Sequence, residues 1–456
     1  MKSLLFILFV SFGFCNLSAQ LVFTSSYTAT VVSKSIAHSD FNLDGNRDFV
    51  VSDYSLNKIK VFLGTGTGNF LTPLEFSVGT TPYFVYAVDL NNDLKTDIIT
   101  ANSNSNNLSV LMGSGNGSFS SAVNYSVGMS PSSITAGDFN GDSKMDIACS
   151  NFTSNDVNVL FGDGSGGLTV SGNYSSGTTV NPVSICNADL NNDAKADLIV
   201  CNKFTNSFSI FLNAGSGLFA SPISYGFTET PVFISSYDFN MDGKKDIITI
   251  NSTSSSLNYR TIGVFTGNGD GTLQSSIDTP GPSLPLSGCI GDFDSNGHLD
   301  VVMAYGGVHS LSFSDGHTDG TFGSILISIS GVTSGAEFVC SADFDNNGKP
   351  DLAYCGNGSV EVLLNNTITG NKEEKQLTNQ LFNVYPNPSN GILFVNSTDV
   401  VKLSLLNEFG QHIQDAELNA GNNYKMVLDD LRDGIYFIKG IGKQGIITKK
   451  IVILKP

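Results

Sequence analysis

Carboxylate and carboxamide side chains recur in this chain at a fixed spacing that suits the binding of a hard cation. A nine-residue segment occurs seven times, as DFNLDGNRD, DLNNDLKTD, DFNGDSKMD, DLNNDAKAD, DFNMDGKKD, DFDSNGHLD and DFDNNGKPD. Positions 1, 3, 5 and 9 of every segment carry Asp or Asn. Oxygen ligands at this density suit Ca²⁺, which takes six to eight oxygens in flexible geometry. Zinc would favour His or Cys at such positions.

The candidate ligands fall into two sets. Positions 1 and 9 are aspartates in all seven segments: Asp40 and Asp48, Asp89 and Asp97, Asp138 and Asp146, Asp189 and Asp197, Asp238 and Asp246, Asp292 and Asp300, Asp343 and Asp351. Positions 3 and 5 combine one Asn with one Asp: Asn42 and Asp44, Asn91 and Asp93, Asn140 and Asp142, Asn191 and Asp193, Asn240 and Asp242, Asp294 and Asn296, Asp345 and Asn347. The order reverses in the last two segments, so every loop keeps three carboxylates, which random polar turns would not preserve.

These segments have two alternative interpretations. An EF-hand needs a Glu at position 12 and a helix on each side. Position 12 is instead occupied by Val51, Thr100, Cys149, Val200, Thr249, Met303 and Tyr354, and the flanks resemble strands. The second interpretation is an Asx-rich hairpin turn that holds no metal.

Seven loops with three carboxylates each contain 21 of the 41 acidic residues, and so account for much of the net charge of −18.

The segments recur every 49 to 54 residues, and each repeat contains four short apolar runs rich in Val, Ile and Phe. One run precedes the acidic segment, one follows it, a third leads into a glycine-rich turn such as GTGTGNF, and a fourth reaches the next repeat. Such runs predict strands, and four strands in about 50 residues predict a propeller blade. The long spacing of repeat five predicts an insertion near SSSLNYR.

The two ends of the repeat array predict a closed ring rather than a linear stack, which would need capping repeats. Repeat seven contains three strands and ends at Leu364, and the missing fourth strand appears at the other end, as Phe23 to Tyr27. We therefore predict an all-β chain, in which a seven-bladed β-propeller of four-stranded blades is closed by its N-terminal strand and followed by a small β-sandwich. Closure removes open sheet edges.

The chain outside the repeats predicts export. Residues 1–19 have the pattern of a secretory signal peptide, with Lys2, an apolar run and small residues up to Ala19. We assign 20–365 to the propeller, 366–380 to a polar linker and 381–456 to a β-sandwich domain. No later run reaches the roughly 18 apolar residues of a membrane helix. The strong negative charge argues against nucleic acid as a partner.

The acidic segments, their period and their copy number resemble the FG-GAP/VCBS repeat family, known from integrin α-subunit propellers and bacterial surface proteins. The resemblance covers about residues 21–365. It implies side-chain ligands at positions 1, 3, 5 and 9 and a backbone carbonyl at position 7. The position 7 residues are Asn46, Lys95, Lys144, Lys195, Lys244, His298 and Lys349. Position 6 favours Gly, so Leu94, Ser143 and Ala194 predict weaker or unoccupied sites in repeats two to four.

The C-terminal stretch resembles the type A sorting domain of the type IX (Por) secretion system of Bacteroidetes. The matching features are the segment YPNP from Tyr385 with Gly391, the segments LSLLNEFG and GIYFIK, and a basic and apolar terminus. The resemblance implies interaction with the type IX secretion machinery, passage across the outer membrane and removal of this domain, followed by release or attachment at the cell surface. An ordinary terminal sandwich domain is the alternative.

Six cysteines remain beyond the signal peptide. Cys186 with Cys201, and Cys340 with Cys355, occupy the same repeat positions 15 residues apart. Each pair is either a disulfide across a hairpin, which export permits, or two small buried thiols. Cys149 and Cys289 have no equivalent partner, and we expect them to be buried and free.

The sequence contains no recognisable catalytic constellation. Neither a GxSxG turn nor an HExxH segment is present, and the five His share no repeat position. We therefore predict a non-enzymatic, monomeric binding or adhesion module for an extracellular glycan or protein. Two alternatives remain: a structural surface component without a discrete ligand, and a polysaccharide-active enzyme such as a calcium-using lyase.

Overall fold

The structure, a computed structural model, describes most of the repeat region and the strands of the C-terminal region. The described residues are 22–252, 260–282, 284–306, 311–327, 329, 332–356, 358–367, 382–385, 392–397, 401–406, 412–418, 423–428, 431, 434–442 and 445–453. The predicted signal peptide, the insertion at 253–259, most of the predicted linker and the Pro386–Gly391 part of the sorting motif lie outside them. The chain divides into two compact units, one formed by Leu21–Asn366 and the other containing Thr367–Pro456.

Seven four-stranded antiparallel sheets build the first unit, one for each repeat. The innermost strands are β2 (Ser33–Ser39), β6 (Pro82–Val88), β10 (Pro131–Gly137), β14 (Pro182–Ala188), β20 (Thr230–Tyr237), β24 (Pro285–Gly291) and β28 (Phe338–Ala342). The second strands are β3 (Asp48–Asp53), β7 (Asp97–Asn102), β11 (Asp146–Asn151), β15 (Asp197–Asn202), β21 (Asp246–Ser252), β25 (Asp300–Tyr305) and β29 (Asp351–Gly356). Every second strand begins at position 9 of an acidic segment, so each segment connects the two inner strands of a blade.

The outer half of each blade follows in the same order. The third strands are β4 (Lys58–Phe62), β8 (Asn107–Leu111), β12 (Asp156–Gly162), β16 (Ser207–Phe211), β22 (Arg260–Phe265), β26 (Leu311–Ser314) and β30 (Ser359–Asn365). The outermost strands are β5 (Leu74–Ser77), β9 (Val123–Ser126), β13 (Leu168–Ser175), β19 (Ile223–Gly226), β23 (Ile277–Pro280), β27 (Leu326–Ile327) and β1 (Phe23–Thr30). A small extra hairpin pairs β17 (Asn213–Gly215) with β18 (Leu218–Phe219).

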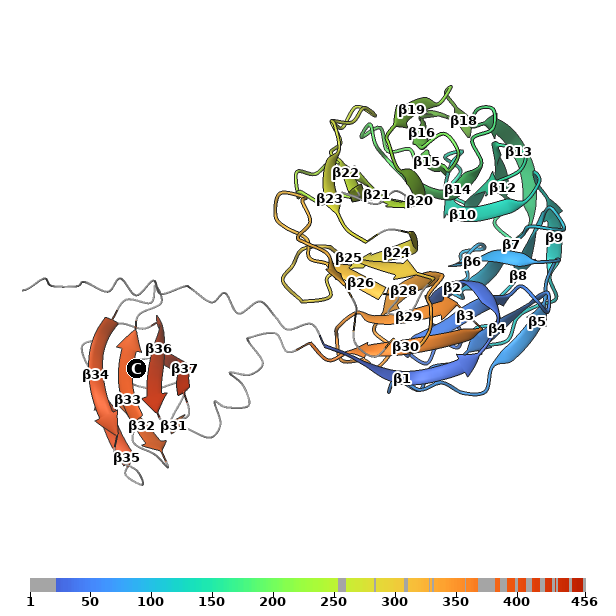
Figure 1. Cartoon of the computed structure of the whole chain (residues 1–456). Coiled ribbons are helices and arrows are strands. Elements are labelled where there is room, and N and C mark those ends of the chain that lie inside the picture. Colours follow the sequence, from blue (N-terminus) through green and yellow to red (C-terminus); the bar gives the residue numbers. More distant parts are fainter. Residues whose placement is uncertain are drawn as a thin grey trace, which may run out of the picture. The chain divides into compact units, whose positions relative to one another are not determined.

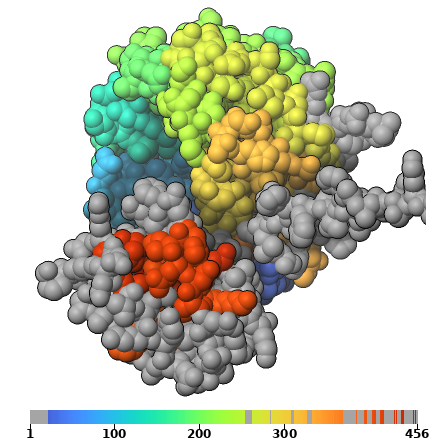
Figure 2. Space-filling model, turned by 90° about the vertical axis from the view of Figure 1, so that its left-hand side faces the viewer, coloured from blue at the N-terminus to red at the C-terminus, as the bar shows by residue number. Residues whose placement is uncertain are grey.

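The blades follow one another around a closed circle, in which β1 (blue) lies beside β30 (orange) (Figure 1). Strand β1 pairs antiparallel with β30 from Phe23 opposite Asn365 to Thr30 opposite Ser359. The innermost strands contact their neighbours around the whole ring, including β2 with β28. In the space-filling view, the segments from green through yellow to orange form one continuous surface (Figure 2). The prediction that the N-terminal strand completes the last blade is therefore confirmed.

The interface that closes the ring uses the same hydrogen bond as two other blade interfaces. The backbone N–H of Gly68, in the glycine-rich turn of the first blade, donates to the carbonyl of Phe344 in the seventh blade at 3.1 Å. Gly117 donates in the same way to Phe41 of the preceding blade at 3.0 Å, and Gly271 to Leu190 at 3.0 Å. Buried apolar residues of the first and seventh blades also share one core cluster. Because the contacts are equivalent, closure leaves no distinct seam.

The second unit contains two antiparallel sheets that share one core. The three-stranded sheet has the order β31 (Phe382–Tyr385), β32 (Ile392–Ser397), β35 (Asn423–Val427). The four-stranded sheet has the order β34 (His412–Leu418), β33 (Val401–Leu406), β36 (Gly434–Gly442), β37 (Gly445–Ile453). Leu393 and Val395 of the first sheet pack with Leu403, Leu405 and Ile438 of the second. This is the predicted β-sandwich. No helix long and apolar enough to span a membrane occurs among the described residues.

Truncation of Phe23 tests how much the closing strand contributes to stability. The Phe23 side chain is 3% exposed, belongs to the core cluster of the sixth and seventh blades and meets the Phe293 ring edge-on at 6.4 Å. We expect Phe23→Ala to lower the free energy of unfolding by about 3–5 kcal/mol, measured by denaturant titration. Val123→Ala, at an outer-strand position that is 54% exposed, is the control and should change it by about 0.5 kcal/mol or less. Equal effects of the two variants would contradict a packed closing strand.

Candidate metal centre

All seven acidic loops lie at the same rim of the propeller, because each connects the end of an innermost strand to the start of a second strand. The turns between the second and third strands lie at the other end of these strands. We call the first edge of the ring the metal rim and the second the opposite rim. The sequence repeat therefore becomes a circle of seven oxygen-rich loops at the metal rim.

Backbone N–H groups hold the acidic side chains of each loop in one arrangement. In the first loop, Asp40 accepts hydrogen bonds from the N–H groups of Asp44 at 3.1 Å and Gly45 at 2.9 Å. Asn42 accepts from Asp44 at 3.1 Å, and Asp44 accepts from Asn46 at 2.8 Å. The same four bonds occur in the other six loops. Side chains at positions 1, 3 and 5 are thus turned inward by the loop backbone.

The aspartate at position 9 is buried in every loop and connects the loop to the rest of its blade. One carboxylate oxygen of Asp48 accepts the N–H of Phe41 at 2.8 Å, and the other accepts that of Gly64, in the glycine-rich turn, at 2.7 Å. The other six loops repeat both bonds, with one N–H donor at position 2 and the other at the start of the turn or, in the seventh blade, at Asn365 at the end of β30. Each carboxylate oxygen has a second lone pair, so these bonds leave room for a cation.

Carboxylate oxygens converge most clearly in the sixth and seventh loops. Asp292, Asp294 and Asp300 each offer an oxygen within 4.8 Å of the others, as do Asp343, Asp345 and Asp351. In the first five loops position 3 is Asn, whose amide oxygen is also a possible ligand atom. In the sixth and seventh loops the structure brings positions 1, 3 and 9 together, and this donor set fits a hard divalent cation.

The electrostatics of position 9 also favour a cation. Burial raises the pKa of Asp351 to about 7, the N–H donors Asn365 and Phe344 offset only part of this rise, and the nearby Asp345 and Asp343 add to it. Burial likewise raises the pKa of Asp300 to about 7 and that of Asp48 to about 6. Burial also raises the pKa of position 9 in the remaining loops. A carboxylate desolvated beside two others is stabilised by either a proton or a metal ion.

The turn at position 6 has a positive φ angle in every loop. Gly45, Gly243, Gly297 and Gly348 occupy it with φ of 81° to 91°. Leu94, Ser143 and Ala194 occupy it in repeats two to four, with φ of 65°, 64° and 63°. Side chains other than Gly pay about 1–2 kcal/mol for this conformation. The structure thus contains the backbone strain that the sequence predicts for these three loops.

The second, third and fourth loops also share an ion pair between the lysine at position 7 and the aspartate at position 5. The ammonium group of Lys95 lies 3.2 Å from Asp93, that of Lys144 3.4 Å from Asp142, and that of Lys195 2.9 Å from Asp193. Each lysine therefore contacts the position 5 carboxylate of its own loop. An incoming cation competes with this ammonium group, which is a further reason to expect weaker sites.

Sequence reasoning missed the apolar residue at position 2, although its signal was present in all seven segments. Phe41, Leu90, Phe139, Leu190, Phe239, Phe293 and Phe344 are all buried. Each donates its N–H to the position 9 carboxylate while its side chain packs in a blade core. A second missed residue is the glycine that opens the turn. A Cβ at Gly64 would lie 2.2 Å from the Arg47 carbonyl oxygen, and one at Gly113 equally close to that of Thr96.

The six described cysteines are free thiols. Cys186 lies opposite Ile199, and Cys201 lies opposite Ser184, so the register separates this pair by two residues. Cys340 lies opposite Ala353, and Cys355 lies opposite Phe338, in the same way. The disulfide alternative is therefore wrong for this structure, whereas the prediction that Cys149 and Cys289 are buried and free is confirmed.

Comparison with known families agrees with this geometry. The FG-GAP-like repeat model matches six overlapping stretches, 40–100, 89–149, 144–200, 189–249, 238–303 and 292–354. The chain belongs to the FG-GAP-like repeat family. The model for the secretion system C-terminal sorting domain matches residues 383–454. This FG-GAP-like repeat protein is therefore addressed by type IX secretion to the cell surface or the extracellular space.

Solved structures share the fold of this FG-GAP-like repeat protein at low identity. The BBS1N chain from a complex with ARL6DN has 11% identity and a TM-score of 0.53, over 75% of this chain and 97% of that chain. A protein from Lactobacillus plantarum has 15% identity and a TM-score of 0.52, over 67% and 87%. A putative 6-phosphogluconolactonase from Bacteroides uniformis has 13% identity and a TM-score of 0.51, over 67% and 88%. No curated protein matches the sequence.

Exchanging glycine and non-glycine residues at position 6 tests the strain in the loops. Leu94 is 84% exposed, so Leu94→Gly removes little packing and should stabilise the second loop by about 1 kcal/mol. A Cβ at Gly45 would meet nothing within 4 Å, so Gly45→Ala adds backbone strain alone and should destabilise the first loop by a similar amount. Thermal melts and calcium titration calorimetry measure both variants. Changes of the same sign in the two variants would contradict this explanation.

The raised pKa values at position 9 predict opposite effects of pH on the metal-free and calcium-loaded protein. A carboxyl whose pKa is raised by folding favours the folded state when protonated, so this stability is full below about pH 4 and lost as pH rises through about 7. Calcium-stripped protein should therefore melt at a higher temperature at pH 5.5 than at pH 8. Calcium affinity should be lower at pH 5.5 than at pH 8, because protons compete with calcium for Asp48, Asp300 and Asp351. A calcium-stripped protein that melts at a lower temperature at pH 5.5 than at pH 8 would contradict this link between protonation and stability.

Proposed function

We propose that this protein is an exported binding module, whose propeller is held rigid by calcium at the metal rim and engages an extracellular glycan or protein at the opposite rim. Up to seven Ca²⁺ ions would be held by side-chain oxygens at positions 1, 3, 5 and 9 and by the backbone carbonyl at position 7. Residues 1–19 would be removed during export, and 381–456 would be removed after passage across the outer membrane, with 366–380 as the linker.

The observation that carries this proposal is the set of exposed apolar side chains on the opposite rim. The metal rim exposes Leu43, Leu94 and Met241 in three of its loops, while its acidic side chains accept hydrogen bonds within their own loops. The opposite rim exposes apolar side chains at the starts of innermost strands and in the turns between second and third strands: Val32, Leu56, Tyr83, Met129, Phe204, Leu284 and Leu286. Hydrogen bonds join these two kinds of segment, such as Ser103 N–H to the Thr81 carbonyl at 2.9 Å. Clustered exposed apolar residues are typical of interaction surfaces.

Calcium would act on stability rather than on chemistry in this proposal. Each ion would neutralise three carboxylates that otherwise repel one another, and would fix the hairpin that connects two inner strands. Rigid strands would in turn keep the opposite rim in one conformation, which favours binding. No described arrangement of side chains requires a catalytic role, so an enzyme is not the function that we propose.

Calcium dependence and ligand binding are tested together. We expect chelation to lower the melting temperature of the full chain by 10 °C or more, on the order of the effect of several ligated ions. We also expect the calcium-loaded protein, but not the chelated protein, to bind components of a glycan array or of bacterial cell surfaces. Asp351→Ala, which removes one position 9 ligand, should weaken the calcium effect on melting. Loss of calcium stabilisation without any surface binding would support a structural component instead.

A further inference from the structure

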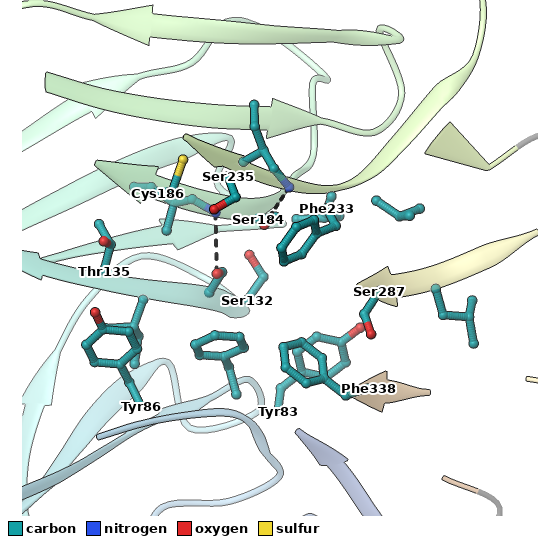
Figure 3. Close-up of a pocket in the computed structure, with 18 of the residues that line it drawn as sticks. Tyr83, Tyr86, Ser132, Thr135, Ser184, Cys186, Phe233, Ser235, Ser287 and Phe338 are labelled. Atoms are coloured by element: carbon teal, nitrogen blue, oxygen red, sulfur yellow. Dashed lines mark hydrogen bonds between the residues drawn. The ribbon is translucent and has the colours of Figure 1, made fainter. Parts of the chain in front are cut away.

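A cavity of about 540 Å³ lies inside the propeller, lined by residues of the innermost strands (Figure 3). At least half of its lining residues lie in the first halves of these strands, and in the fourth and fifth blades the lining continues to Asn187 and Tyr237, shortly before the acidic loops. The cavity therefore extends from the side of the opposite rim along the innermost strands. Its volume falls within the range of small-molecule sites, about 300–1,000 Å³.

The innermost strands present one residue each at the mouth of the cavity. These residues stand six positions before the first Asp of each acidic segment: Lys34, Tyr83, Ser132, Val183, Val232, Leu286 and Glu337. In five blades the strand register shifts at this residue, as between Pro82 and Phe84 or between Pro285 and Ser287. A bulge inserts an extra residue and re-aims its side chain. The repeat thus keeps a bulge at the cavity mouth while the residue type varies.

The position that follows the bulge position in each innermost strand holds an aromatic residue in some blades and a serine in others. Phe84, Phe233 and Phe338 occupy it in three blades, and the rings of Phe84 and Phe338 meet edge-on at 5.7 Å. Serines occupy it in three further blades that line the cavity, as Ser133, Ser184 and Ser287. Phe233, Phe338, Ser184 and Ser287 are seen around the cavity in Figure 3. The wall therefore combines flat apolar surfaces with polar oxygens.

Two of these serines connect neighbouring blades, and the third has no such bond. Ser133 Oγ accepts the N–H of Ile185, and Ser184 Oγ accepts the N–H of Ile234, both at 3.4 Å (Figure 3). Accepting a backbone N–H leaves a hydroxyl its own hydrogen to donate. Ser287 is 2% exposed, and its Oγ has no hydrogen-bond partner. A buried hydroxyl without a partner is destabilising, and a polar ligand in the cavity would supply one after rotation about a single bond.

Two of the three charges among the described lining residues of the cavity cancel. Lys34 forms an ion pair with Glu337 across the junction of the first and seventh blades. Lys203 is the remaining charged residue among the described lining residues, and it is exposed at the edge, in the turn after β15. Inside the cavity an anion would lose hydration and could meet only the exposed Lys203 at the edge, and a cation would meet no unpaired opposite charge among the described lining residues. An uncharged ligand that offers both hydroxyl groups and an apolar face has no such penalty.

We infer that the cavity binds a neutral saccharide, with sugar rings packed against Tyr83 and Phe233 and sugar hydroxyls bonded to the serines of the wall. This inference rests on the proposed binding function and adds its ligand class and its site. Sugar rings combine an apolar face with a rim of hydroxyl groups, which matches a wall that contains both phenyl rings and serines. The saccharide would enter from the opposite rim and leave the calcium loops untouched.

Titration calorimetry of the full, calcium-loaded chain with cellotetraose, xylotetraose, mannotetraose and chitotetraose tests this inference. We expect at least one of these neutral probes to bind. Tyr83→Ala and Phe233→Ala should each weaken that binding about tenfold. Tyr83 is 46% exposed, so its truncation disturbs little packing, and thermal melts with calcium verify folding of both variants. Val123→Ala is the control, since Val123 is an exposed residue of the outermost strand β9, belongs to neither rim surface and does not line the cavity.

The outcomes separate this inference from the function on which it rests. Weakened binding in both cavity variants, with Val123→Ala within about twofold of the parent, supports the cavity site. Undiminished binding in both cavity variants overturns the site and leaves the binding function standing. Tighter binding of tetragalacturonate than of any neutral probe, lost at high salt, overturns the neutral ligand class. If none of the neutral probes binds, the inference fails, and the glycan-array and cell-surface assay alone decides the proposed function.

Discussion

A buried carboxylate that accepts two backbone hydrogen bonds is the interaction on which each blade depends. Asp48 and its six equivalents connect three segments of the chain: the acidic loop, the second strand and the glycine-rich turn. Burial of an aspartate is unfavourable, and the raised pKa of about 7 at Asp300 and Asp351 measures part of that cost. Two N–H donors offset it incompletely, so the loop retains an affinity for positive charge. Structural role and metal-binding capacity thus come from the same side chain.

Repetition converts this local interaction into a ring. In three blades the glycine-rich turn that donates to the position 9 carboxylate of its own blade also donates to the position 2 carbonyl of the preceding blade, as Gly117 does to Phe41. One turn therefore holds the metal loop and the blade interface in place together. The same bond from Gly68 to Phe344 joins the first and last blades. Stability should accordingly spread around the ring, with a loosened loop affecting its neighbour as well as its own blade.

The antiparallel arrangement of each blade separates two kinds of surface. Acidic loops occur where innermost strands end, and bulged residues such as Tyr83 occur where innermost strands begin. A change of residue at the bulge alters the cavity mouth without touching a carboxylate. Residue types at that position vary from Lys34 to Leu286, whereas position 9 is always Asp. The fold thus permits variation in what is bound while the interactions that hold the blades remain constant.

The sequence by itself determined the features that depend on nearby residues. Ligand positions, strand order, the αL turn at Leu94 and the closing strand from Phe23 all follow from spacing, because a loop or hairpin is built from neighbours in the chain. Other features depended on register between distant strands. A shift of two residues separates Cys186 from Cys201, and bulges turn Tyr83 and its equivalents toward a shared cavity. Spacing carries no information on either, because strand register and the closing of the circle are set by packing among all seven blades.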